Sequence, residues 1–130
     1  MAQATAFSNK KTLHLRGDII DLSDKKVMGV VNLTPDSFYE GSRVNELTSV
    51  IRVAEKMLID GACFIDLGGY SSRPGAADIS LEEELNRVIP HISAIRKHLP
   101  DLYISVDTCR AKVAEEAVNH GADIINDISA

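Results

Sequence analysis

The feature that most constrains the fold of this chain of 130 residues is an alternation of strand-like and helix-like segments that starts at Val27. Short apolar segments are followed by longer ones with apolar residues at helical spacing. The predicted strands are Val27–Val31, Cys63–Ile65, Tyr103–Val106 and Asp123–Ile125. Strands that alternate with helices are parallel and joined by right-handed crossovers. The sequence therefore predicts an α/β fold, either a doubly wound sheet or part of a (β/α)8 barrel.

Three predicted helices connect these strands. The first ends before Gly61, which supplies a C-terminal stop. The second begins with a capping box, Ser80-x-x-Glu83, and should be kinked by Pro90. The third, over residues 110–120, is expected to bury Val113, Ala117 and Val118. Because the strands are almost entirely apolar, we expect both faces of the sheet to be covered.

The ends of the chain differ from this pattern. Residues 1–11 are polar and are predicted to be a disordered lead. Thr12–Arg16 and Ile19–Leu22 alternate around Gly17-Asp18, which predicts a small β-hairpin that caps the bottom of something larger. Residues 12–130 are then one partial domain, which stops as its fourth strand ends. A complete barrel takes about 250 residues, so this chain would supply only part of one. No G-x-G-x-x-G follows the first strand, which weakens the dinucleotide-binding alternative.

Composition excludes some classes of function. The net charge of −5 argues against nucleic acid as a partner, because a phosphate backbone attracts a basic surface. No apolar run approaches the roughly 20 residues that cross a bilayer. Cys63 and Cys109 are far apart and form no C-x-x-C pair, so we expect free thiols and a cytoplasmic protein. The four histidines, His14, His91, His98 and His120, suit no metal site and are expected at the surface.

Polar residues follow each predicted strand. Asn32, Asp66, Asp107 and the pair Asn126-Asp127 stand where the four strands end. Any one of them could instead be a helix cap or a turn residue. Parallel strands bring these ends to one edge of the sheet, however, and the whole set is better explained as a binding site. Carboxylates and amides there can hydrogen-bond the mixed donor–acceptor edge of a heterocycle. The acidic run at residues 82–84 is expected to complement a helix dipole.

The loop after the second strand is rich in small and hydroxylated residues. It runs Gly68-Gly69-Tyr70-Ser71-Ser72-Arg73-Pro74-Gly75. Small residues allow the backbone to approach an anion, hydroxyls donate hydrogen bonds, and the arginine offers a cationic fork to phosphate oxygens. This loop therefore predicts a phosphate site next to the polar strand ends.

Four segments resemble the dihydropteroate synthases, folate-pathway enzymes that join p-aminobenzoate to a pterin. They are residues 27–43 with Thr34-Pro35-Asp36-Ser37-Phe38, the loop just described, Ser105-Val106-Asp107-Thr108, and residues 124–129. They occur in the family's order. The resemblance implies the N-terminal half of a (β/α)8 TIM barrel, with about four parallel strands and their helices behind the hairpin. It also implies displacement of diphosphate from a dihydropterin-methyl diphosphate by the amine of p-aminobenzoate.

The resemblance assigns roles to particular residues. Asp107 and Arg73 are the expected catalytic residues, and Asn32 is expected to ligate the cofactor Mg2+. Asp107 and Asn126 would recognise the pterin ring, beside Ile128 on the pocket wall. The loop after the first strand would contact substrate through Asp36 and Phe38, and the loop after the second strand through Ser72 and Pro74. Phe38 and Pro74 would enclose the aminobenzoate ring, where sulfonamides compete.

Some features depart from the family pattern. Tyr70 replaces the usual glutamate, and Ser72 the usual threonine. The family's later lysine, arginine, histidine and second aspartate fall beyond Ala130. We therefore expect little or no activity from this chain alone, and strand edges that promote self-association. A homodimer is expected of the parent enzyme.

Two other functions remain open. One is a pterin-binding methyltransferase domain, which shares the barrel and parts of the pterin site. The other is a non-catalytic fragment that binds pterin without turnover. The intact loops at residues 34–38 and 72–75 favour the synthase, because a methyltransferase has no diphosphate to bind.

Overall fold

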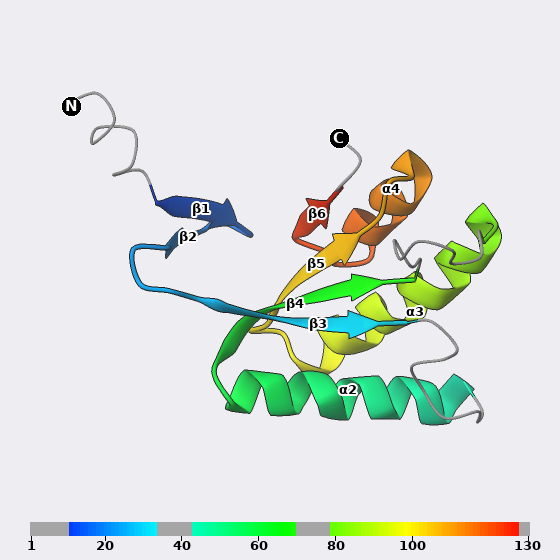
Figure 1. Ribbon diagram of the computed structural model, residues 1–130, viewed down its shortest axis with the longest axis horizontal. Coiled ribbons are helices and arrows are strands. Elements are labelled where there is room, and N and C mark those ends of the chain that lie inside the picture. The colour runs from blue at the N-terminus through cyan, green and yellow to red at the C-terminus, as the bar shows by residue number, and fades with distance from the viewer. Residues whose placement is uncertain (1–10, 34–42, 70–78, 128–130) are drawn as a thin grey trace.

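The computed structural model describes residues 11–33, 43–69 and 79–127. These residues form a two-stranded hairpin and a four-stranded parallel sheet with the strand order β3-β4-β5-β6, flanked by helices (Figure 1). The elements in chain order are β1 Thr12–Leu15, β2 Asp18–Asp21, β3 Val27–Asn32, α2 Arg43–Ile59, β4 Ala62–Gly68, α3 Leu81–His98, β5 Tyr103–Asp107, α4 Ala111–Asn119 and β6 Ile124–Asn126. The predicted α/β class and parallel pairing are confirmed.

The hydrophobic core lies between the helices and one face of the parallel sheet. The three helices lie along the same side of the strands (Figure 1). The strand residues in this core are Val31, Ile65, Leu67, Ile104 and Val106. The opposite face is less protected, since Val30 of β3 retains 61% of its exposure. The prediction that both faces are covered is therefore wrong for β3, because the described helices all pack on one side.

The second strand is longer than predicted. The sequence placed its end before Asp66, whereas β4 continues to Gly68. The cause is pairing with β3, whose last residue, Asn32, lies beside Gly68 in register. A backbone hydrogen bond from Leu33 N–H to the Gly68 carbonyl oxygen extends this pairing one residue beyond β3. Asp66 therefore lies within the strand and is buried.

The helices confirm most of the predicted signals. Gly61, with φ +112°, follows α2, and the Ser80 side chain accepts a hydrogen bond from Glu83 N–H at the start of α3. Helix α3 continues on both sides of Pro90. Val118 corrects one prediction, because its side chain is 54% exposed. Val113 and Ala117 are buried one turn apart, and Val118 lies about 100° further round α4.

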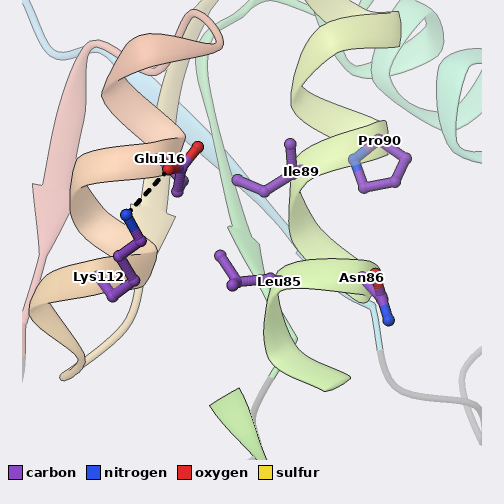
Figure 2. Close-up of a pocket in the computed structure, with 6 residues that line it drawn as sticks. All are labelled: Leu85, Asn86, Ile89, Pro90, Lys112 and Glu116. Carbon is purple, nitrogen blue, oxygen red and sulfur yellow. Dashed lines mark ion pairs between the residues drawn. The ribbon is translucent and has the colours of Figure 1, made fainter. Parts of the chain in front are cut away.

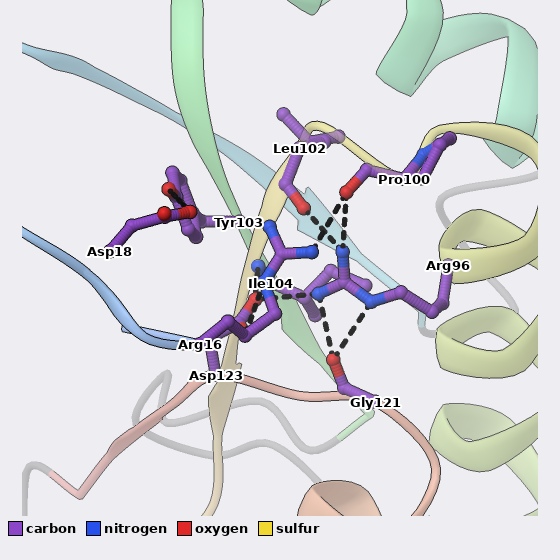
Figure 3. A network of polar contacts seen from close by, with 9 residues as sticks. All are labelled: Arg16, Asp18, Arg96, Pro100, Leu102, Tyr103, Ile104, Gly121 and Asp123. Atoms are coloured by element: carbon purple, nitrogen blue, oxygen red, sulfur yellow. Dashed lines mark hydrogen bonds and ion pairs between the residues drawn. The ribbon is translucent and has the colours of Figure 1, made fainter. Parts of the chain in front are cut away.

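The hairpin contacts the end of the sheet at which the strands begin. Its turn residues, Arg16 and Gly17, both have positive φ. The Arg16 guanidinium pairs with Asp123 at 2.9 Å and lies 4.7 Å from the centroid of the Tyr103 ring (Figure 3). These partners precede β6 and open β5, so the hairpin contacts the predicted bottom of the sheet.

Candidate functional site

A row of polar side chains crosses the sheet where the strands end. Register places Asn32 beside Gly68, and Asp107 beside Asn126. Between these pairs, a Cβ atom added at Gly68 would lie 3.5 Å from the Asp107 Cβ atom. That distance is an ordinary van der Waals contact, so Gly68 and the Asp107 side chain are direct neighbours at the centre of the row. Strands lie about 4.8 Å apart, so Asn32 is roughly 10 Å from Asp107.

A second polar pair lies one step deeper on the same face. Asp66 and Ser105 are neighbours in register and precede the first row by two residues, so their side chains share its side of the sheet. Asp66 is buried, with only 6% of its surface exposed. Among the described residues, Asp66 Oδ1 and Ser105 Oγ are buried without a hydrogen-bond partner. Buried polar atoms without partners are rare, so this pair offers binding capacity to a ligand.

The environment favours the protonated form of both carboxyls. Burial raises the pKa of Asp66, and the charge of Asp107 adds to the rise. Burial also raises the pKa of Asp107, with a further contribution from the charge of Asp127. Beside these carboxyls, which accept hydrogen bonds, the Asn126 side-chain amide can both donate and accept them. The site can therefore bind a heterocycle edge that carries both kinds of group.

Several predicted site residues fall outside the described ranges. They are Asp36, Phe38, Ser72, Arg73, Pro74 and Ile128. Three of the predicted site residues lie within the described ranges, and they form one row on one face of the sheet: Asn32, Asp107 and Asn126.

One described residue suits a metal ion that is shared with a substrate. Asn32 is exposed at the end of β3, and its amide oxygen is a hard donor. Within residues 11–33, 43–69 and 79–127, no three His, Cys, Asp or Glu side chains gather where they could hold a metal. Mg2+ commonly uses one or two protein oxygens together with water and substrate phosphates. The described residues therefore fit Mg2+ only in that shared form.

Comparison with known proteins identifies the family. Residues 28–130 match the model of the family described as pterin binding enzyme. The chain belongs to the pterin-binding enzyme family. It is 53% identical over 103 residues to the dihydropteroate synthase of Synechocystis sp., a match that covers 79% of this chain and 35% of that enzyme.

Solved structures of pterin-binding enzymes support the same assignment. The chain matches a Xanthomonas albilineans dihydropteroate synthase with 4-aminobenzoic acid at 39% identity and a TM-score of 0.83, over 92% of this chain and 44% of that one. It matches the Yersinia pestis dihydropteroate synthase in a sulfonamide drug complex at 47% identity and a TM-score of 0.80, over 90% and 42%. These neighbours are TIM barrels, so the fold prediction is confirmed. The chain spans less than half the length of each.

The polar contacts behind the row were not predicted from the sequence. Glu84 was assigned to a helix dipole, yet it is 1% exposed and accepts a hydrogen bond from Thr108 Oγ1 at 2.6 Å. Its other oxygen, Oε1, lies 3.2 Å from Arg110 Nη1. A glutamate at a position one turn before the buried Val88 was the available signal, because that spacing places it on the inner face of the helix.

The histidine prediction needs one correction. His14, His98 and His120 are exposed, as predicted, whereas His91 is buried. Its Nδ1 lies 2.6 Å from the Arg87 carbonyl oxygen, and its Nε2 lies 3.8 Å from Glu46. His91 follows Glu84 by two turns on the inner face of α3, which explains its burial. Both cysteines are free, as expected.

A cavity of about 280 Å³ lies between α3 and α4, away from the polar row (Figure 2). It is lined by Leu85, Asn86, Ile89, Pro90, Lys112 and Glu116. Its charged groups already pair with each other, since Lys112 Nζ lies 3.2 Å from Glu116 Oε1. The described residues predicted for the site, Asn32, Asp107 and Asn126, are not among its lining residues, so the polar row remains the candidate site.

Proposed function

We propose that this chain carries the pterin-binding part of a dihydropteroate synthase. The reaction condenses 7,8-dihydropterin-6-ylmethyl diphosphate with p-aminobenzoate to give dihydropteroate and diphosphate. The observation that carries the proposal is the single row of Asn32, Asp107 and Asn126 at the strand ends of a pterin-binding enzyme. The relatives named dihydropteroate synthase add the specific reaction.

Asp107 and Asn126 are the proposed pterin ligands. They are adjacent in register, which suits two neighbouring hydrogen bonds to one edge of a planar ring. Asp66 lies a step below them, with a buried oxygen that has no described partner. A pterin presents N–H donors and ring acceptors side by side, so mixed carboxyl and amide groups complement it better than a cation would.

The proposed chemistry needs electrostatic stabilisation and no covalent nucleophile on the protein. The bond from the pterin methylene carbon to the diphosphate oxygen breaks, and the aminobenzoate nitrogen forms the new bond to that carbon and releases one proton to solvent. Positive charge develops on the pterin methylene as diphosphate leaves. Asp107 stabilises this charge, and Arg73 binds the opposite charge on diphosphate.

We assign Asn32 to Mg2+ and to the diphosphate end of the substrate. The separation of roughly 10 Å between Asn32 and Asp107 suits a ligand whose ring and leaving group are at opposite ends. When bound, the metal would neutralise charge on diphosphate. The remaining proposed substrate contacts are Asp36, Phe38, Ser72, Pro74 and Ile128. Of these, Phe38 and Pro74 would lie beside the aminobenzoate ring, where sulfonamides would compete.

The partners in this proposal are small molecules. We also propose a cytoplasmic location and a homodimeric parent enzyme. The proposal includes no nucleic-acid or membrane partner. Of the helices in the described ranges, none combines the length and the apolar character that a bilayer crossing requires.

Diphosphate release tests the proposed function. The chain is given dihydropterin-methyl diphosphate, p-aminobenzoate and Mg2+, with and without the remaining segment of a full-length relative. We expect release only when that segment is present, and loss of release with Asp107→Asn. Pterin binding without release in either mixture would favour a non-catalytic binding fragment. Absence of both, with the two parts shown to fold together, would contradict the proposal.

A further inference from the structure

We propose that Glu84 and Thr108 are positioning residues that hold Asp107 in the polar row from the helix side of the sheet. This inference rests on the proposed function, because it concerns the same site. Neither residue was predicted to bind substrate, and both are buried behind the row.

Thr108, the residue that follows Asp107, has three hydrogen bonds to other elements. Its hydroxyl donates to Glu84 Oε2 at 2.6 Å and accepts from the Arg110 backbone N–H at 3.2 Å. Its own backbone N–H donates to the Asn126 carbonyl oxygen at 3.2 Å. The residue next to Asp107 is therefore tied to α3, to the start of α4 and to β6.

Glu84 places a carboxylate in this buried region. A buried carboxylate is costly unless it is paired and hydrogen-bonded. Arg110 supplies the opposite charge at 3.2 Å, and the Thr108 hydroxyl supplies the hydrogen bond. Arg110 also donates a hydrogen bond through Nη2 to the carbonyl oxygen of Ile79, which lies two residues before the start of α3. The Glu84 carboxylate is costly to bury and has two specific contacts, to Thr108 and to Arg110, so it is better explained by geometric precision than by core stability.

The same helix turn also holds the end of β4. Arg87, one turn after Glu83, donates through Nη1 to the Gly69 carbonyl oxygen at 3.0 Å. A Cβ atom at Gly69 would lie 2.9 Å from Val88 Cγ2, so the backbone here packs directly on α3. The first turns of α3 therefore bind the chain just after β4 and just after β5. These are the two places from which Gly68 and Asp107 enter the row.

Thr108→Val tests this inference, because it keeps the shape of the side chain and removes the hydroxyl. Thr108→Ser is the matched variant that keeps the hydroxyl. Val113→Ala, a buried change in α4 at a residue that is not part of the row, controls for loss of stability. We expect Thr108→Val to weaken the binding of 7,8-dihydropterin about tenfold, with Thr108→Ser and Val113→Ala within about twofold of wild type.

A second measurement needs no ligand. In the free chain, we expect faster amide hydrogen exchange at residues 108 and 110 in Thr108→Val than in Val113→Ala, and a changed pKa of Asp107. Glu84→Gln should show a smaller effect, because it still offers an oxygen to Thr108. Equal exchange in Thr108→Val and Val113→Ala would overturn the inference. If the wild-type chain binds no dihydropterin even when it is folded with the remaining segment of a full-length relative, the proposed function fails, while the exchange comparison still decides the positioning role.

Discussion

Asp66 and Asp107 are two carboxyls on one face of the sheet whose pKa values are both raised. Burial is the main cause for each, and each also lies near another carboxylate. Such groups are more useful to a ligand than to the fold, since their charged forms oppose folding. At the scale of the residue, the site is therefore a place where stability is given up for binding.

This conflict predicts a specific dependence of stability on pH. The raised pKa of Asp66 means that its contribution to stability is fully present below its usual value of 3.8 and is lost as the pH rises through the folded value. Asp66→Asn is neutral throughout. We therefore expect its free energy of unfolding, relative to wild type, to increase from about pH 4 to pH 7, measured by urea titration.

Asp21→Asn is the control of opposite sign. Hydrogen bonds from Ser23 lower the pKa of the exposed Asp21, so its contribution appears above its usual value and is lost as the pH falls. The Asp21→Asn variant should thus lose stability relative to wild type as the pH rises. A flat difference for Asp66→Asn across this range would contradict the explanation from burial.

Asp123 is a buried charge with a structural role. It pairs with both Arg16 and Arg96 and accepts a hydrogen bond from Ile104 N–H at 2.9 Å (Figure 3). Asp123→Ala would leave the buried Ile104 N–H without its acceptor, while both arginines keep carbonyl acceptors, so we expect a loss of about 1–3 kcal/mol in the free energy of unfolding. Asp123→Asn should lose less, because it still accepts from Ile104. Urea unfolding measures both, and Asp101→Ala, an exposed aspartate, should stay near wild type.

At the scale of the element, helix α3 connects the site to the core. Its inner face contributes Val88, Ile92 and Ile95 to the core, while Glu84 and Arg87 at its start contact the strand ends. Stability of the first turn of α3 should therefore influence both folding and the site.

The N-cap of α3 gives a direct test at this scale. Ser80 Oγ accepts from Glu83 N–H at 3.1 Å. Ser80→Ala removes that acceptor and should lower the free energy of unfolding by about 1 kcal/mol. Ser93→Ala, at an exposed position in the middle of the same helix, is the matched change and should be neutral or slightly stabilising. Equal effects of the two variants would show that the cap contributes nothing.

At the scale of the whole molecule, the described sheet has two open edges. Strands β3 and β6 each pair on one side only among the described strands, and β3 exposes Val27, Met28 and Val30. Exposed apolar strand edges favour pairing with another chain. The larger solved relatives are closed barrels, in which further strands occupy such edges.

We therefore expect self-association of this chain that increases with concentration, measured by sedimentation velocity. Val27→Lys, which places a charge on the β3 edge, should shift the distribution toward the monomer. Val118→Lys changes an equally exposed valine on α4, away from the edge, and should leave association unchanged. A chain that stays monomeric at high concentration would contradict the prediction.

Local sequence patterns were enough to predict the order of strands and helices along the chain, the hairpin, the Ser80 cap and the polar strand ends at Asn32, Asp107 and Asn126. These depend on periodicity and on short-range chemistry, which local residues specify. Long-range contacts, in contrast, extend β4 to Gly68, place Asp66 a step below the row, and bury Glu84 and His91. Strand register and the contact of α3 with the strand ends join residues far apart in the chain, and no local pattern encodes those distances.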